Sequence, residues 1–240
     1  MKIIAMHKVD AAMERGALPS QDVLEKMGAF IGETLQKGIL LGGEGLHRSA
    51  TRARLTLTRG EPVVERGPYS GRNELIAGVC MLRSSNLDEA IGWAGRLAKS
   101  LGEGAEIELG PIVEEWDLGG PPPANKPPPR FLALAKADAK SEAGAPFLPR
   151  VEAPLAEMKR ANVLIAAHGL TPSSQGKRVQ KRKDRRQIVD GPFAESKELI
   201  AGFAILDLPG WDEVLAFSDR FADILGGELE MDLRPLASSP

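Results

Sequence analysis

The chain contains few cysteine, histidine and aromatic residues. Among its 240 residues are one cysteine, three histidines and one tyrosine, and aromatic residues make up 5%. A single cysteine excludes an intrachain disulfide and fits a reducing compartment. This thiol, Cys80, lies in an apolar run, so we expect it to be buried and unreactive. No cysteine lies near a histidine and no two histidines stand four residues apart, so the sequence predicts no metal site.

Long apolar runs and an excess of one charge are also missing. The N-terminal apolar run is too short for a signal peptide, and no segment approaches the roughly 20 apolar residues of a membrane span. We therefore expect a cytoplasmic protein without a membrane partner. The net charge is -2, so no overall field favours nucleic acid. Phosphate-binding, dinucleotide-binding and nucleophile-elbow motifs are absent, and we expect no cofactor.

An internal repeat organises the chain. The pentapeptide Glu-Leu-Ile-Ala-Gly at 74–78 recurs at 198–202, and the same offset relates a Gly-Pro pair at 67–68 to one at 191–192. Chance does not align a pentapeptide and several glycines and prolines at one offset. The sequence therefore predicts a tandem duplication.

The predicted repeats span residues 1–117 and 130–237. The segment between them, 118–129, is so rich in proline that it excludes helix and sheet pairing and favours extended polyproline II. We interpret it as a semi-rigid spacer between two domains, with a docking site for a proline-reading domain as the alternative.

Each repeat reads as strand, helix, strand, hairpin, strand, helix, strand. In the first repeat we expect a strand at 3–6, a helix at 21–37 capped by Ser20, a strand at 39–41, a hairpin at 54–65, a strand at 76–82, a helix from 88 and a strand at 105–109. In the second we expect a strand at 131–135, a helix near 152–161, a strand at 163–165, a hairpin at 177–189, a strand at 200–206, a helix from 212 and a strand at 229–233.

This order is the ferredoxin-like split βαβ plan with an added hairpin, an α+β fold. Both helices would cover one face of a mostly antiparallel sheet, which leaves the other face to be covered. Two ferredoxin-like repeats can cover each other in this way. We therefore expect an intrachain pseudo-dimeric α/β barrel.

Three segments carry a resemblance to a known family. The segment Asp-Gly-Pro-Phe-Ala-Glu-Ser-Lys-Glu at 190–198 resembles the signature of the DGPF, or YCII-related, proteins. Gly-Gly-Glu-Gly-Leu at 42–46 resembles the family's turn after its second strand, and the end at 230–236 resembles the family's usual end. The resemblance implies a dimeric α/β barrel with a cleft between two sheets and no assigned reaction. It also implies an acid–base His-Asp pair in short members, and a link of some relatives to sigma factors.

The two repeats differ at a polar corner. Asp190 matches the aspartate of the family, where the first repeat has Arg66. Asp190 is interpreted either as a general acid or base that faces the cleft or as a side chain that caps its own turn. His168, expected in the turn after the second strand, is interpreted either as a packed polar residue or as the partner that rebuilds a His-Asp pair. An ion pair between Arg66 and Asp190 is a further alternative.

The same corner supplies candidate ligand-binding residues. In the first repeat, the side chains at 66, 69 and 72 would shape a pocket or hold an anion. The full candidate set for ligand binding is Glu44, Arg66, Tyr69, Arg72, Phe193, Glu195 and Lys197.

A basic cluster at 177–186 distinguishes the second repeat. It is interpreted as a solvated hairpin edge, where charges also block edge-to-edge aggregation. Binding of nucleic acid or an acidic protein is the alternative. Stacking aromatics are missing from the cluster, which counts against recognition of single strands.

Two interpretations of the function stay open. The first is a protein that binds a small organic ligand in the cleft between the repeats and acts on it by cofactor-free acid–base chemistry. The second is a non-enzymatic ligand-sensing or protein-interaction module linked to transcriptional regulation. Whether the protein is an enzyme stays open in the sequence, and we expect a monomer that acts as a pseudo-dimer, or a homodimer.

Overall fold

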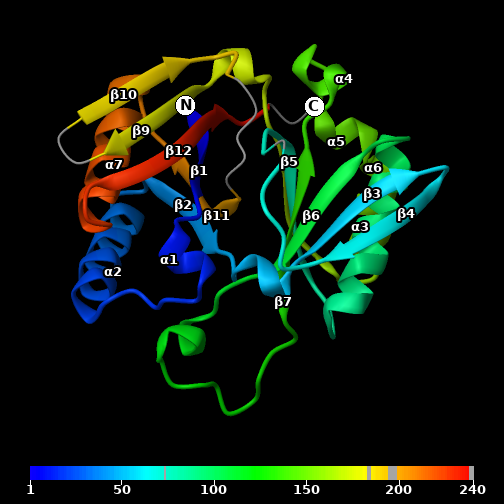
Figure 1. The fold of residues 1–240 in the computed structure, drawn as a ribbon, viewed down its shortest axis with the longest axis horizontal. Coiled ribbons are helices and arrows are strands. Elements are labelled where there is room, and N and C mark those ends of the chain that lie inside the picture. The colour runs from blue at the N-terminus through cyan, green and yellow to red at the C-terminus, as the bar shows by residue number, and fades with distance from the viewer. Residues whose placement is uncertain (73, 183–184, 194–198, 238–240) are drawn as a thin grey trace. The chain divides into compact units, whose positions relative to one another are not determined.

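The chain forms two six-stranded antiparallel sheets in two compact units (Figure 1). This is a computed structural model, and it describes residues 1–240 except 73, 183–184, 194–198 and 238–240. Among the described residues, unit 1 contains 1–44, 173–193 and 200–236, and unit 2 contains 45–172, 199 and 237.

In unit 1 the strand order is β10-β9-β12-β1-β11-β2. The helices α2 and α7 pack on one face of this sheet (Figure 1), and the rings of Phe30 and Phe217 meet there at 4.9 Å. The elements are β1 (Lys2–Lys8), α1 (Ala11–Glu14), α2 (Gln21–Gln36), β2 (Leu40–Gly45), the 3-10 turn η3 (Ser173–Gln175), β9 (Lys177–Arg182), β10 (Arg185–Asp190), β11 (Ile200–Asp207), α7 (Trp211–Ile224) and β12 (Glu228–Pro235).

In unit 2 the strand order is β4-β3-β6-β7-β5-β8. The helices α3 and α6 pack on one face of this sheet, around a core that includes Leu97 and Met158. The elements are η1 (Ser49–Thr51), β3 (Ala53–Thr58), β4 (Glu61–Arg66), β5 (Ile76–Arg83), α3 (Leu87–Leu101), β6 (Glu106–Pro111), η2 (Glu115–Leu118), β7 (Arg130–Lys136), α4 (Ala139–Glu142), α5 (Phe147–Arg150), α6 (Glu152–Arg160) and β8 (Leu164–Gly169).

Each unit is built from parts of both predicted repeats. In unit 2, β6-β7-β5-β8 with α6 and α3 reproduces the ferredoxin-like strand order, and the β3–β4 hairpin is added beside β6. The portion β7-α6-β8 comes from the second predicted repeat, and the remaining strands come from the first. Unit 1 is assembled reciprocally from β1-α2-β2 and β9 to β12. The compact units therefore divide the chain differently from the sequence repeats.

Neither sheet closes on itself. Among the described strands, β10 and β2 are the edges of one sheet, and β4 and β8 are the edges of the other. The structure thus agrees with α+β units of ferredoxin-like plan, but it shows no closed barrel, and the expected barrel is not confirmed.

Several local predictions are confirmed. The Val23 N–H donates to the Ser20 hydroxyl at 3.3 Å, so Ser20 caps α2 as expected. The next predicted helix begins one residue early, at Leu87, because the Asn86 side chain accepts from the Glu89 N–H at 2.9 Å and caps it. Cys80 is 1% exposed, and burial raises the pKa of its thiol to about 12, in agreement with an inert cysteine.

Two predicted turns are strands instead. The glycines at 42–45 lie in β2, and His168 lies in β8 opposite Val79 of β5. The glycines mark a close backbone approach rather than a turn, since a Cβ on Gly43 would lie 2.7 Å from the Phe203 carbonyl oxygen. Both second strands are therefore longer than their apolar residues indicated.

Arginine and glycine have changed places between the units. In unit 2, a Cβ on Gly110 of β6 would lie 3.0 Å from Cγ of buried Arg52. In unit 1, a Cβ on Gly176 would lie 2.6 Å from Cδ of buried Arg234 of β12. Position 52 corresponds to 176 in the predicted repeat, and 110 corresponds to 234. Each unit thus holds one buried guanidinium beside a glycine, but from opposite strands.

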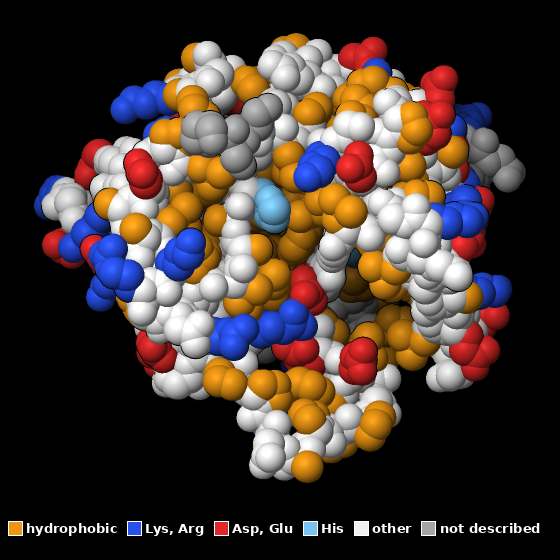
Figure 2. Space-filling view, turned by 180° about the vertical axis from the view of Figure 1, so that it is seen from behind, with side chains coloured by type: hydrophobic (Ala, Val, Ile, Leu, Met, Phe, Trp, Pro, Cys, Tyr) orange, Lys and Arg blue, Asp and Glu red, His pale blue; other side chains and the backbone are white. Residues whose placement is uncertain are grey.

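The surface carries charges of both signs. On the face in Figure 2, acidic and basic side chains are interspersed with apolar ones, in keeping with a net charge of -2. Within the part of the chain that the structure describes, no helix is both long and apolar enough to span a membrane.

Candidate functional site

The sheet of unit 2 carries charged side chains on one face. Side chains alternate along a strand, so Leu55 and Ile107 enter the core below α3, while Arg54 and Glu108 point to the opposite face. Lys136, at the end of β7, follows Ala135 of the core and lies on that opposite face as well. These side chains belong to a group that we call the charged cluster: Arg52, Arg54, Tyr69, Arg72, Glu74, Glu106, Glu108 and Lys136.

The centre of the charged cluster is fully buried. The Arg52 Nη1 donates to the Glu108 Oε1 at 2.7 Å, and the Lys136 Nζ donates to Glu74 and lies 3.3 Å from the Glu108 Oε2. The side chains of Arg52, Glu74, Glu108 and Lys136 are at most 2% exposed. Burial raises the pKa of Glu108, but Lys136 and Arg52 outweigh burial and hold that pKa below its usual value. The carboxylate is thus kept ionised by its neighbours.

The charged cluster continues outward through four side chains. The guanidinium of Arg54 stacks 4.1 Å above the ring of Tyr69, and its own side chain is 2% exposed. Arg72 donates to the Glu106 Oε2 from Nη2 at 2.7 Å and from Nε at 3.0 Å. The cluster therefore runs without a break from the interior to the exposed Arg72.

In the part of the charged cluster formed by Arg54, Tyr69 and Glu106, each side chain has one buried atom without a hydrogen-bond partner among the described residues. These atoms are Arg54 Nε, Tyr69 Oη and Glu106 Oε1. Arg54 Nε and Glu106 Oε1 lie 3.6 Å apart, which is too far for a hydrogen bond. Buried polar groups are normally paired with protein or with a bound molecule. The three atoms therefore mark unsatisfied hydrogen-bonding capacity within the charged cluster.

The Tyr69 hydroxyl keeps its proton in this setting. Burial raises the pKa of Tyr69, the charge of Glu108 raises it further, and Arg52 and Arg54 only partly oppose this. A phenol with a raised pKa donates a hydrogen bond but does not ionise near neutral pH. Among the three atoms, Glu106 Oε1 is thus the acceptor and Tyr69 Oη is a donor.

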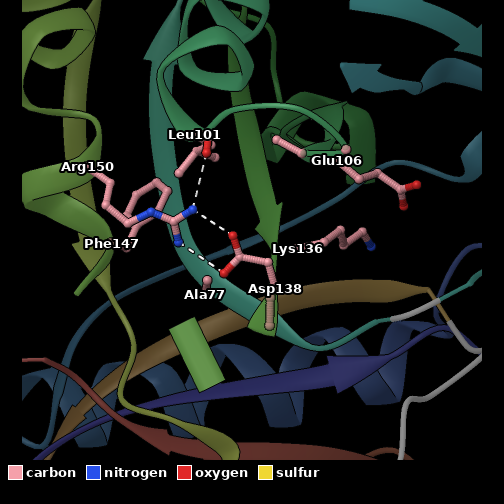
Figure 3. Close-up of a pocket in the computed structure, with 10 residues that line it drawn as sticks. Ala77, Leu101, Glu106, Lys136, Asp138, Phe147 and Arg150 are labelled. Atoms are coloured by element: carbon pink, nitrogen blue, oxygen red, sulfur yellow. Dashed lines mark hydrogen bonds and ion pairs between the residues drawn. The ribbon is translucent and has the colours of Figure 1, made fainter. Parts of the chain in front are cut away.

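A pocket of about 120 Å³ adjoins the charged cluster. It is lined by Ala77, Leu101, Gly104, Ala105, Glu106, Lys136, Ala137, Asp138, Phe147 and Arg150. Arg150 and Asp138 face each other in Figure 3, with Nη2 to Oδ2 at 2.6 Å and Nη1 to Oδ1 at 3.1 Å, while the side chains of Glu106 and Lys136 extend away from this pair. The hydrogen bonds from Arg150 hold the pKa of Asp138 well below its usual range. The pocket thus lies between an ion pair and the charged cluster.

Unit 1 contains a smaller counterpart. Its buried Asp232 accepts from the Arg178 Nε at 2.6 Å and lies 3.1 Å from the Lys8 Nζ. The Arg178 guanidinium stacks 4.7 Å above the ring of Phe193, as Arg54 stacks above Tyr69. Phenylalanine has no hydroxyl, so this counterpart lacks the phenol of the charged cluster.

Asp190 and His168 belong to different units. Asp190 ends β10 in unit 1, where its carboxylate, 76% exposed, accepts from the Lys177 ammonium across the ladder. His168 is half-buried in β8 of unit 2. Neither unit by itself contains the expected His-Asp pair, and the pairing stays a prediction.

The other candidates are distributed unevenly. Tyr69 and Arg72 lie in the charged cluster, whereas Arg66 is exposed and donates to Asp88. Phe193 lies under a guanidinium of unit 1, and Glu44 is half-buried in β2. The candidates at 195 and 197 lie outside the described residues.

The sequence interpretation missed the inner members of the charged cluster. Arg54, Glu108 and Lys136 stand in strands that otherwise read as buried, and the other copy of each strand has Arg178, Asp232 and Lys8 at the matching places. Charges of fixed sign at matching strand positions were the signal that could have found them. Within the described residues, no three histidine, cysteine or acidic side chains lie close enough to hold a metal ion.

The basic hairpin β9–β10 has acidic partners within unit 1. Lys181 donates to Asp223 and Arg186 donates to Asp219, both on α7. The predicted hairpin at 177–189 includes residues 183–184, which lie outside the described residues, and residue 185 begins β10. These ion pairs of the basic hairpin attach it to α7.

Comparisons with known proteins agree with the resemblance over part of the chain. An uncharacterized protein of Rhizobium meliloti strain 1021 is 31% identical over 68 residues, which make up 28% of this chain and 55% of that protein. The match thus spans about half the length of that relative. No solved structure matches. The family model of the YCII-related domain matches residues 130–229, a stretch of the chain that contributes strands to both units.

Proposed function

We propose that the protein binds a small polar organic molecule at the charged cluster of unit 2 and in its adjoining pocket. The observation that carries this proposal is the set of three buried atoms without hydrogen-bond partners among the described residues, Arg54 Nε, Tyr69 Oη and Glu106 Oε1. Leaving such groups unpaired costs about 1–3 kcal/mol each, so a bound partner that satisfies them gains that free energy.

The same arrangement supports cofactor-free acid–base chemistry. Glu106 Oε1 is a carboxylate oxygen with no donor bound to it among the described residues, so it is the proton acceptor that we propose. Tyr69 retains its proton, and Arg54 is cationic, so both would stabilise negative charge that develops on a bound molecule.

The YCII-related segment supports the proposal because it contributes Lys136 to the charged cluster.

We also propose that the chain arose by tandem duplication. The exchanged arginine and glycine positions support this, since each unit keeps one buried guanidinium at the equivalent place.

A thermal-shift screen of a metabolite library tests the binding proposal. Wild type, Glu106→Gln and the control Glu228→Gln are compared; residue 228 is exposed in unit 1. We expect compounds that raise the melting temperature of wild type and of the control but not of Glu106→Gln. If every stabilising compound acts equally on all three proteins, the charged cluster is not the binding site.

A ligand sensor and an enzyme would both give such compounds. Incubation of a Glu106-dependent compound with the protein, followed by one-dimensional NMR of the compound, separates them. Conversion by wild type and not by Glu106→Gln supports the acid–base reaction. An unchanged compound favours the sensing alternative.

A further inference from the structure

We infer that the ligand of the charged cluster is electrically neutral and presents a hydrogen-bond acceptor and a donor on neighbouring atoms, as a carboxamide or a lactam does. This inference rests on the proposed function, and it specifies the chemical class of the bound molecule.

The first argument is the balance of charge. Apart from the exposed Arg72, the charged side chains of the charged cluster are three cations and three carboxylates, each at most 15% exposed: Arg52, Arg54, Lys136, Glu74, Glu106 and Glu108. An ionic ligand would add a buried charge with no counter-charge, which is costly. Arg72 and Glu65, which lie 3.9 Å apart and are both about half exposed, add one charge of each sign and so leave this balance unchanged.

The second argument is the pattern of donors and acceptors. The Arg54 Nε only donates, the Glu106 Oε1 only accepts, and the Tyr69 hydroxyl does both. The first two atoms are 3.6 Å apart. The carbonyl oxygen of a planar amide can accept from Arg54 while its N–H donates to Glu106. Because the Tyr69 ring lies 4.1 Å from the Arg54 guanidinium, we assign its O–H to the second lone pair of the carbonyl oxygen.

Ions match this pattern poorly. A carboxylate offers only acceptors, so it would oppose the carboxylate of Glu106. An ammonium group offers only donors, so it would leave the N–H of Arg54 unsatisfied and face its positive charge. The adjoining pocket of about 120 Å³ is smaller than ordinary ligand pockets of about 300–1,000 Å³, so we infer a molecule of few heavy atoms.

The single tyrosine of the chain provides a direct test. Tyr69 is the one tyrosine in the sequence, so the full-length protein labelled with ¹³C-tyrosine gives one set of ring signals. Acetamide and 2-pyrrolidinone are titrated at millimolar concentration, with acetate and methylammonium as charged probes of similar size. We expect saturable shifts of the Tyr69 signals with the two amides and no saturable shift with the two ions.

Variants connect the shift to the site. In Glu106→Gln the amide should bind about tenfold more weakly or worse, since a hydrogen bond to a charged acceptor is lost. In Glu228→Gln the affinity should equal that of wild type. Both variants keep Tyr69 as the reporter, and cooperative thermal unfolding without probe shows that each has folded.

The outcomes separate this inference from the proposed function. If acetate or methylammonium gives the saturable, Glu106-dependent shift, or if the Glu106-dependent compounds of the library screen are ions, the neutral-amide inference is wrong and the binding site stands. If no probe shifts Tyr69, the inference is also overturned. If in addition no library compound stabilises wild type more than Glu106→Gln, the proposed function is wrong as well.

Discussion

At the residue scale, burial has opposite consequences for charged groups with and without a counter-charge. Glu108 stays ionised in the interior because Lys136 and Arg52 surround it. For His7, the opposing charge of Asp10 is too weak to offset the effect of burial. The His7 ring lies in β1 at 5.3 Å from the ring of Phe221, and burial lowers its pKa from 6.5 to about 4 although Asp10 opposes the shift.

His7 should make the protein less stable in mild acid. The unfolded chain takes up a proton near pH 6.5 and the folded one only near pH 4, so stability is fully present above 6.5 and is lost as the pH falls towards 4. The loss is at most about 3 kcal/mol. Urea denaturation at pH 7 and pH 4.5 should show a smaller loss in His7→Phe than in wild type. Equal losses in the two proteins would contradict this assignment.

Lys136 should be far more important for stability than a surface lysine. Lys136→Met leaves Glu74 and Glu108 short of one buried counter-charge, and removal of one partner from a buried pair costs about 3–5 kcal/mol. Lys99→Met is the matched control, since Lys99 is 48% exposed and pairs with Glu61; its loss costs about 1 kcal/mol or less. Chemical denaturation of the three proteins measures the difference. Similar losses for the two lysines would show that the charged cluster is hydrated.

At the scale of elements, the same side-chain position can be filled from either of two neighbouring strands. Arg52 precedes β3 and lies over Gly110 of β6, whereas Arg234 of β12 lies over Gly176, which precedes β9. A bulky side chain and a glycine are thus needed as a pair, because a Cβ at either glycine meets the arginine at 3.0 Å or less.

Exchange of the pair within unit 2 should therefore be cooperative. Gly110→Arg alone places two arginines at one site, and Arg52→Gly alone leaves Glu108 with one donor fewer. The double variant Arg52→Gly/Gly110→Arg reproduces the arrangement of unit 1. We expect its free energy of unfolding to exceed the value from adding the two single effects, by about 1–3 kcal/mol, as is usual for coupled neighbours. If denaturant titrations show that the effect of the double variant equals the sum of the two single effects, the two positions are not interchangeable.

At the scale of the whole molecule, one unit is almost continuous in sequence and the other is not. Residues 45–172 include every strand of the second sheet and the helices α3 and α6, whereas unit 1 needs segments from both ends of the chain. Residues 1–117, the first predicted repeat, contain neither β7 nor β8.

A fragment of residues 45–172 should accordingly fold by itself. It contains the β3–β4 hairpin, the ferredoxin-like strand order and the charged cluster. We expect cooperative thermal unfolding by circular dichroism and a dispersed amide NMR spectrum. A fragment of residues 1–117 of comparable length, as the control, lacks β7 from the centre of that sheet and should be less stable. A folded 1–117 together with an unfolded 45–172 would show that the units do not fold as the structure divides them.

The sequence by itself determined the local structure. Apolar periodicity located α2, an acidic first turn indicated α3, Ser20 marked a helix start, and alternation with turn residues located the β3–β4 hairpin, because these features depend on neighbours along the chain. It also indicated the inert Cys80 and two of the cluster residues, Tyr69 and Arg72. Glycine positions predicted local structure least well, because glycine occurs both in turns and in strands that closely approach another backbone, as at Gly43.

Only the tertiary structure decided which segments share a sheet. β1 and β7 hold matching places in the predicted repeats, so each could pair with strands of its own repeat or of the other, with similar side-chain contacts. The structure pairs β1 with β11 and β12, and β7 with β5 and β6. That long-range choice brings Lys136 to Glu74 and Glu108 and so creates the charged cluster. Ion pairs between segments that are distant in sequence follow from strand pairing, and no local pattern encodes them.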